Sequence, residues 1–331
     1  MNDHDQPGLF DAASVAPPPT PAPGFRGITY HEHRARTLLN KIPGARPGGM
    51  AWTLNPYRGC THACTYCFAR DNHARLGLDT GEGFNTQVVV KTNAADVLRR
   101  ELRGGKTGDD WVMVGTSTDC YQRAEGHYRL MPGILRTLTD HRVNFTTTTK
   151  SALLRRDIPL LAEAARVANV LVMTSLGSLD ERVWRAFEPG AAPPRARLAT
   201  IAALRAAGVA AGVLIAPVIP HAGDRPAALD ALVDACAEAG AVTVYPDVMR
   251  ISPGARDWFL TQSAAHLPPH LHQLLAASYA NSRSMPASYV REVTAHLHAR
   301  AARHGLPRWE DYIRDVSRRT PDSKSPRQRD R

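Results

Sequence analysis

Short apolar runs typical of strands alternate with helical periods along most of this 331-residue chain. From residue 50 onward, the predicted strands begin about 30 residues apart, which is the length of a strand–helix–strand unit. Such a unit crosses over in the right-handed sense and places its strands parallel in one sheet. Six units therefore predict an α/β fold with a curved parallel sheet or partial barrel. We expect strands at 50–57, 111–115, 143–148, 170–174, 209–215 and 242–245, and helices at 94–102, 130–140, 157–168, 180–187, 195–207 and 226–239.

The ends of the chain differ in composition from this alternating core, 48–253. Residues 1–24 include a proline-rich run that cannot bury enough apolar surface to fold, so we expect a disordered leader. Residues 25–47 are an accessory segment with a short helical pattern around 34–40. After the core, we expect a helical C-terminal extension at 254–317, with helices at 255–260, 269–279 and 287–304, and a disordered basic tail at 318–331.

Three of the five cysteines, Cys60, Cys64 and Cys67, lie in one short run with the spacing Cys-x3-Cys-x2-Cys. Thiols this close in sequence cannot all pair as disulfides, and three soft sulfur ligands on one loop suit a metal ion or an iron–sulfur cluster. No second Cys-x2-Cys pair is present, so a four-iron cluster held here would keep one iron open for substrate chemistry. The alternatives are a zinc site completed by His62 or Cys120, and three unrelated thiols.

The cysteine run, with Tyr66 before its last cysteine, resembles the cluster loop of the radical S-adenosylmethionine (radical SAM) superfamily. The longer stretches 55–60 and 66–70 resemble the spore photoproduct lyase-like branch, which is often labelled DNA repair photolyase. The resemblance covers residues 47–253 and implies a partial (β/α)6 barrel with the cluster loop after the first strand. It also implies a [4Fe–4S] cluster held by the three cysteines, and S-adenosylmethionine bound at the fourth iron.

Function in parallel α/β sheets collects at the carboxyl ends of the strands, and several of these ends are polar here. Ser117, Thr118 and Asp119 follow the second barrel strand, where the resemblance implies that they accept the methionine ammonium of the cofactor; a turn with a helix cap is the alternative. Lys150 follows the third strand and would meet the methionine carboxylate, unless it is a surface lysine. Ser175 ends the fourth strand and is expected to hydrogen-bond the ribose or the methionine, although a strand-end serine is commonly structural.

The fifth strand ends in an uncharged run around Ala216 that suits packing against the adenine of the cofactor. Tyr66 is expected near the same ring. The glutamate that the superfamily often has in this run is missing, which removes one route of adenine recognition. Residues 188–190 and Arg197 resemble another polar block of the branch, which we expect at the barrel mouth.

The remaining cysteines are isolated in the sequence. In spore photoproduct lyase a strand-end cysteine supplies hydrogen to the product radical, but the matching position here is Thr116. Cys120 is therefore expected to be either a catalytic hydrogen donor that quenches a radical or a buried inert thiol. Cys236 shares a helical face with Leu229 and Leu232, which indicates a core position.

Together, these features predict a radical SAM enzyme that cleaves S-adenosylmethionine to a 5′-deoxyadenosyl radical, with lyase-like chemistry on an unnamed substrate. The net charge of +10 permits an anionic partner such as DNA or RNA without selecting either, because many arginines lie on predicted helix faces. We also expect a reductant such as flavodoxin or ferredoxin, a cytoplasmic monomer and no membrane span. The alternative function is a non-catalytic zinc or iron–sulfur protein that binds nucleic acid.

Overall fold

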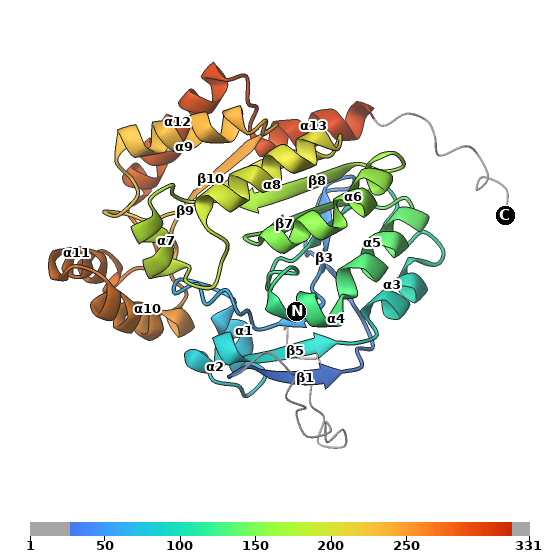
Figure 1. The fold of residues 1–331 in the computed structure, drawn as a ribbon, viewed down its shortest axis with the longest axis horizontal. Helices are drawn as coiled ribbons and strands as arrows, with labels where there is room; N and C mark the ends of the chain where they lie inside the picture. The colour runs from blue at the N-terminus through green and yellow to red at the C-terminus, as the bar shows by residue number, and fades with distance from the viewer. Residues whose placement is uncertain (1–26, 320–331) are drawn as a thin grey trace.

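The computed structural model describes residues 27–319, apart from the side chain of Arg319. A seven-stranded sheet forms the centre of the molecule (Figure 1). Six of its strands are parallel and lie in the order of the sequence, while β2 adds an antiparallel edge. The predicted α/β fold with a parallel sheet is thereby confirmed. From one edge to the other, the strands are β2 (Leu39–Lys41), β3 (Met50–Leu54), β6 (Trp111–Val114), β7 (Asn144–Thr149), β8 (Val170–Ser175), β9 (Ala210–Val218) and β10 (Val244–Val248).

Helices that follow the strands cover the outer face of this sheet (Figure 1). They form because apolar side chains recur at helical spacing; in α3, for example, Ala94, Val97, Leu98 and Leu102 are buried. The predicted helices agree with these elements to within a few residues. The layer consists of α3 (Ala94–Leu102), α5 (Leu130–Asp140), α6 (Ile158–Ala165), α8 (Pro194–Ala206) and α9 (Pro226–Glu238), and the shorter elements are α1 (Arg70–Ala74), α2 (Glu82–Thr86), α4 (Arg123–Tyr128), a 3-10 turn (Ala152–Asp157) and α7 (Glu181–Phe187).

A second, three-stranded sheet lies beside the barrel and holds part of the accessory segment. Its order is β1 (Thr29–His33), β5 (Gln87–Lys91), β4 (Tyr57–Arg58). The short helix expected around 34–40 is wrong, because the chain there is irregular up to residue 38 and then enters β2. The backbone N–H groups of Leu38 and Leu39 donate to the carboxylate of Glu101 on α3 instead of to helical carbonyls. Contacts with a distant helix thus override the local helical pattern.

The C-terminal extension is helical, as predicted, but it contains one helix more than expected. Its helices are α10 (Pro253–His266), α11 (Pro269–Tyr279), α12 (Ala287–Arg303) and α13 (Trp309–Arg319). Helix α13 was not predicted, although its apolar residues recur at helical spacing, and the first two residues of the predicted tail 318–331 belong to it. The rest of that tail and the predicted leader 1–24 lie outside the described residues. No helix between residues 27 and 319 is both long and apolar enough to cross a membrane.

Helix α13 closes the end of the barrel at which the strands begin. Ile313 packs with Trp111, Leu171 and Met173, which lie near the starts of β6 and β8. The indole N–H of Trp111 also donates to the hydroxyl of Ser317 at 3.0 Å. With this end filled by side chains, the space for a ligand lies at the carboxyl ends of the strands.

We predict that Ile313→Ala lowers the free energy of unfolding by about 2–4 kcal/mol, because it leaves a cavity among buried apolar side chains. Urea unfolding followed by circular dichroism measures the change. Arg318→Ala is the matched control on the same helix, since Arg318 is exposed, and it should change the stability by less than about 0.5 kcal/mol. Equal effects of the two substitutions would show that α13 does not close the barrel.

Candidate functional site

A cavity of about 650 Å³ opens at the carboxyl ends of the parallel strands. The cysteine loop forms one of its walls, and the residues that end β6, β7, β8, β9 and β10 form the others. All of the residues predicted to bind a metal or cofactor line it, which brings together positions from five separate stretches of the chain. They are Cys60, Cys64, Tyr66, Cys67, Ser117, Thr118, Asp119, Lys150, Ser175 and Ala216.

The cysteine loop is placed by the short antiparallel pair of β4 and β5, between which it lies in the chain. Its first cysteine, Cys60, donates its backbone N–H to the carbonyl of Phe84 on the returning segment. Gly59 adopts a φ of 79°, and a Cβ there would overlap the carbonyl oxygen of Gln87. The position before Cys60 therefore requires glycine.

Arg70 joins the cysteine loop to α2 and to the turn before it. Its guanidinium is fully buried and donates to the backbone carbonyl of Cys64 at 3.1 Å and to the side chain of Asn85 at 2.8 Å. The same group lies 4.8 Å from the ring centroids of both Phe84 and Trp258. Because Trp258 belongs to α10, this stack also anchors the C-terminal extension to the loop.

Cys60 and Cys64 are buried, Cys67 is partly buried, and none of the three has a disulfide partner. Burial raises the pKa of each, that of Cys64 to about 12. Backbone N–H groups of His62 and Asp119 point at the sulfur of Cys60 and act in the opposite direction. A desolvated sulfur that receives N–H donors is suited to binding as a thiolate to a metal, which offsets the cost of deprotonation.

The two proposed fourth ligands of a zinc site are not available. Nε2 of His62 lies 2.9 Å from the carboxylate of Asp119, and its Nδ1 lies 3.1 Å from the carbonyl oxygen of Gly190. Cys120 is buried elsewhere. Among residues 27–319, no three His, Cys, Asp or Glu side chains converge closely enough to hold one metal ion. The donor set therefore fits a larger group held by three thiolates better than a single zinc ion.

The carboxylate of Asp119, which was predicted to accept the cofactor ammonium, is already hydrogen-bonded to groups of the protein itself. Its carboxylate accepts from the hydroxyl of Thr149 at 2.8 Å and from the backbone N–H groups of Lys150 and Tyr121 at 2.7 and 2.8 Å, besides the contact with His62. Burial alone would raise its pKa, but His62 and these donors outweigh burial and hold the pKa below its usual value. Asp119 thus joins the cysteine loop to the ends of β6 and β7.

The neighbouring residues also hold the loop in place. The hydroxyl of Thr118 and the side-chain amide of Gln122 both donate to the carbonyl of Gly59, at 2.8 and 2.9 Å. Gln122 in turn accepts the backbone N–H of Thr61 at 3.0 Å. Gln122 was not predicted as a site residue, although it belongs to the polar run 115–122 that follows β6 and contains predicted site residues. Ser117 also lines the cavity, and its hydroxyl forms no hydrogen bond with any residue between 27 and 319.

A second buried carboxylate, Glu188, is the centre of a polar network on the other side of the cavity. It accepts from the hydroxyl of Tyr66 and forms ion pairs with Lys150 at 3.0 Å and Arg197 at 2.5 Å. Burial acts to raise its pKa, but the two cations outweigh burial and lower the pKa to about 2. Lys150 also donates to the hydroxyl of Ser175. The sequence placed Glu188 and Arg197 at the barrel mouth, but only the structure reveals the partners they hold.

Two further hydrogen bonds connect this network to the ends of β8 and β9. The hydroxyl of Ser175 donates to the carbonyl of Ala216 at 2.7 Å. Arg197, which is itself buried, donates to the carbonyl of Ser175 at 2.9 Å. These three residues fix the backbone of two adjacent strand ends where they face the cavity.

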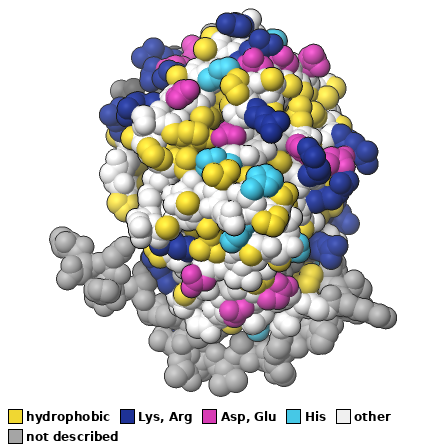
Figure 2. Space-filling model, turned by 90° about the vertical axis from the view of Figure 1, so that its left-hand side faces the viewer, with side chains coloured by type: hydrophobic (Ala, Val, Ile, Leu, Met, Phe, Trp, Pro, Cys, Tyr) yellow, Lys and Arg dark blue, Asp and Glu magenta, His cyan; other side chains and the backbone are white. Residues whose placement is uncertain are grey.

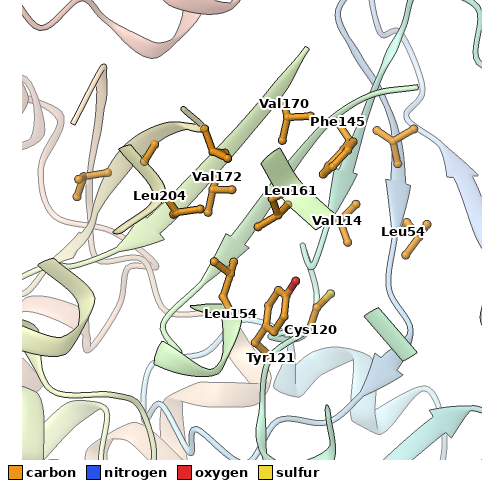
Figure 3. Close-up of a cluster of buried hydrophobic side chains, with 14 of the residues drawn as sticks. Leu54, Val114, Cys120, Tyr121, Phe145, Leu154, Leu161, Val170, Val172 and Leu204 are labelled. Atoms are coloured by element: carbon orange, nitrogen blue, oxygen red, sulfur yellow. The ribbon is translucent and has the colours of Figure 1, made fainter. Parts of the chain in front are cut away.

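Cys120 is the one predicted site residue that the structure does not bring to the cavity. It lies beside Tyr121 among apolar side chains of the core, and burial raises its pKa well above the usual value (Figure 3). Gly115 separates it from the cavity, since a Cβ on Gly115 would lie 3.0 Å from the sulfur. This position favours the buried, inert thiol over the hydrogen donor. Cys236 is buried in the core, as predicted.

The C-terminal extension contributes to the site in a way that the sequence did not indicate. Cys64 and Tyr66 pack in one apolar cluster with Phe259 of α10 and Tyr279 of α11. The rim of the cavity is completed by the end of β10, by the residues just after it and by the segment between α11 and α12. These residues are Asp247, Val248, Arg250, Ile251, Ser252, Arg283 and Ser284.

Known proteins share both the sequence and the fold. A sequence model described as the radical SAM superfamily matches residues 54–245, more than half of the chain. An uncharacterized protein of Mycobacterium tuberculosis is 45% identical over 283 residues, which cover 84% of this chain and 83% of that protein. An uncharacterized protein of Methanocaldococcus jannaschii is 27% identical over 194 residues, which cover 56% of this chain and 66% of that protein.

Solved structures of spore photoproduct lyase share the fold at low sequence identity. One mutant form matches with a TM-score of 0.62 and 16% identity, and the match covers 83% of this chain and 79% of that one. Another, with bound S-adenosylmethionine and dinucleoside spore photoproduct, matches with a TM-score of 0.60, the same identity and the same coverage. The cysteine loop, the six-stranded parallel core and the match over residues 54–245 agree, and the chain belongs to the radical SAM superfamily.

Proposed function

We propose that this protein binds a [4Fe–4S] cluster through Cys60, Cys64 and Cys67, and S-adenosylmethionine in the same cavity. The observation that carries the proposal is that the three thiols of one loop and the ends of five parallel strands line one cavity of about 650 Å³. When bound, the two groups supply a reductive cleavage of the sulfonium C–S bond to methionine and a 5′-deoxyadenosyl radical, which abstracts hydrogen from a substrate.

In this proposal the residues of the chain bind, orient and exclude water. Lys150 offers an ammonium group at the end of β7 for the methionine carboxylate, and Ser117 offers an unoccupied hydroxyl for its ammonium. Ser175, Ala216 and Tyr66 form the side on which the ribose and adenine rest. The network around Glu188 holds three of these residues in position before the cofactor arrives.

We further propose a nucleic acid as the substrate, with lyase-like chemistry. The net charge of +10 and the likeness of the fold to spore photoproduct lyase, of which one structure holds a dinucleoside, support this. Figure 2 shows Lys and Arg side chains gathered along the upper part and the right-hand side of one face. A reductant such as flavodoxin or ferredoxin, and a cytoplasmic monomer, complete the proposal.

The alternative of a non-catalytic metal module that binds nucleic acid accounts for less of the molecule. Such a module requires no cavity beside its cysteines and no charged network at the strand ends. The buried ion pair of Glu188 and Arg197 would have no role in such a module. A radical SAM enzyme requires both a cluster site and a cofactor site, and the cavity offers room for both.

We predict that the protein, reconstituted anaerobically with iron and sulfide, forms 5′-deoxyadenosine when dithionite and S-adenosylmethionine are added. Chromatography of the quenched mixture measures the product. A variant in which Cys60, Cys64 and Cys67 are all alanine is the negative control. If an intact cluster forms but no 5′-deoxyadenosine appears, the proposed catalysis is wrong.

We predict that Cys64→Ala abolishes the visible absorbance of the reconstituted cluster, because one of three thiolate ligands is lost. Cys236→Ala is the matched control, since it also removes a buried thiol but lies in the core of α9, and it should keep the absorbance. Full absorbance in the Cys64 variant would refute the ligand assignment.

We predict that Glu188→Gln lowers the free energy of unfolding by about 3–5 kcal/mol near neutral pH, because it leaves Lys150 and Arg197 buried without their counter-charge. Lys150 and Arg197 lower the folded-state pKa of Glu188 to about 2 from its ordinary value of 4.5. Its stabilising effect is therefore present above pH 4.5 and is lost as the pH falls toward 2, so the difference between variant and wild type should shrink over that range.

Urea unfolding of the cluster-free protein at a series of pH values measures this difference. Glu181→Gln is the matched control, because Glu181 forms an exposed ion pair with Arg185 one turn along α7. It should change the stability by less than about 0.5 kcal/mol at every pH. A destabilisation by Glu188→Gln that does not vary with pH would contradict the charge-based explanation.

A further inference from the structure

The end of the sixth parallel strand, β10, has a charged pair that the proposed cluster and cofactor sites do not use. Asp247 lies in β10 and Arg250 shortly after it, and both line the cavity. The match to the superfamily ends at residue 245, so this pair belongs to a part of the rim that the shared core does not supply. Residues that differ between enzymes of one fold usually select the substrate.

The backbone explains why Asp247 and Arg250 are at the rim. The pairing of β10 with β9 shifts register between Pro246 and Val248, and such an irregularity re-aims the side chain within it. Nη2 of Arg250 then lies 2.5 Å from the carboxylate of Asp247. One carboxylate thus holds the guanidinium beside the cavity.

A second arginine reaches the same rim from the segment between α11 and α12. The backbone N–H of Ile251 donates to the carbonyl of Arg283 at 2.9 Å. The backbones of Arg250 and Ser284 pair as an isolated antiparallel β-bridge. Within residues 27–319, the guanidinium of Arg283 has no hydrogen-bond or ion-pair partner, and that of Arg250 has only Asp247. The rim therefore has one more positive charge than negative charge.

The other lysine that lines the cavity is already assigned. Lys150 shares the carboxylate of Glu188 with Arg197, and it is the residue proposed for the methionine carboxylate of the cofactor. Among the described residues that line the cavity, Arg250 and Arg283 are therefore the cations that remain for an anionic group of a substrate. Phe68, beside the last cysteine, lines the same cavity with 58% of its surface exposed. A large exposed aromatic ring that lines the same cavity as two guanidinium groups suits a planar base and a phosphate of one ligand.

We propose that Arg250, held by Asp247, and Arg283 form the subsite that binds a backbone phosphate of a nucleic-acid strand, and that Phe68 stacks on one of its bases. This inference rests on the proposed function, because it assigns the substrate side of the same cavity. The arginines are specificity-determining residues, whereas Asp247 is a positioning residue.

Fluorescence anisotropy with a labelled single-stranded oligodeoxynucleotide tests the subsite. The reconstituted protein is used without reductant and without S-adenosylmethionine, so that only binding is measured. Arg250→Ala and Arg283→Ala should each weaken binding about 5- to 20-fold and reduce the slope of log K against log salt by about 0.7, the value for one phosphate contact on a single strand. Phe68→Leu should weaken binding about fivefold or more, and Phe68→Tyr should retain it.

Arg314→Ala is the matched control. Arg314 forms the same type of pair, with Asp311 three residues away, but lies on α13 at the opposite end of the barrel. It should change the affinity less than about twofold. Cluster absorbance and thermal unfolding check that each variant is folded, and Arg250→Lys, which keeps the charge without the planar fork, should recover only part of the affinity.

Equal losses in the Arg250 and Arg314 variants would overturn the proposal, because they would reveal binding by net charge alone. The proposal also fails if a labelled oligoglutamate peptide binds as tightly and depends equally on Arg250. Formation of 5′-deoxyadenosine by the wild type is measured separately, so a failure of the proposed catalysis is distinguishable from a failure of this subsite.

Discussion

The cavity of this protein depends on two buried carboxylates, Asp119 and Glu188, each of which has several partners. An ionised carboxylate away from water is costly unless charges and donors surround it, so every one of those partners is held in place. Asp119 joins His62 of the cysteine loop to the end of β7, and Glu188 joins Tyr66 of the same loop to Lys150. The loop is thereby fixed against the strand ends from both sides.

Different segments of the chain form the wall of the cavity, the closed end of the barrel and the rim. The parallel strands and the cysteine loop form the wall that the superfamily shares, α13 fills the opposite end of the barrel, and the segments after β10 supply the rim. Helix α10 contacts the cysteine loop at two points. Trp258 stacks on Arg70, and Phe259 packs in one apolar cluster with Cys64 and Tyr66.

Sequence reasoning succeeded where the signal is local and failed where distant contacts decide. Helix α5 was predicted with its observed ends because its apolar residues recur at helical spacing, and Cys60, Cys64 and Cys67 share one loop because they are neighbours in the chain. The local pattern around 34–40 predicts a helix, but the backbone there donates to Glu101, which lies more than 60 residues away in the sequence. Helix α13 was not predicted, although Trp309, Tyr312, Ile313 and Val316 recur at helical spacing; only the structure shows that this face packs on the barrel end.

By itself, the sequence determined the order of strands and helices, the thiol-rich loop and the set of polar strand ends, because period, spacing and residue type are properties of the chain. Only the tertiary structure decided which of these side chains are free to meet a ligand. It placed Cys120 in the core and surrounded Asp119 with internal donors, whereas Ser117 kept an open hydroxyl. The reason is that burial and hydrogen-bond partners depend on residues far apart in sequence that become neighbours only when the sheet has formed.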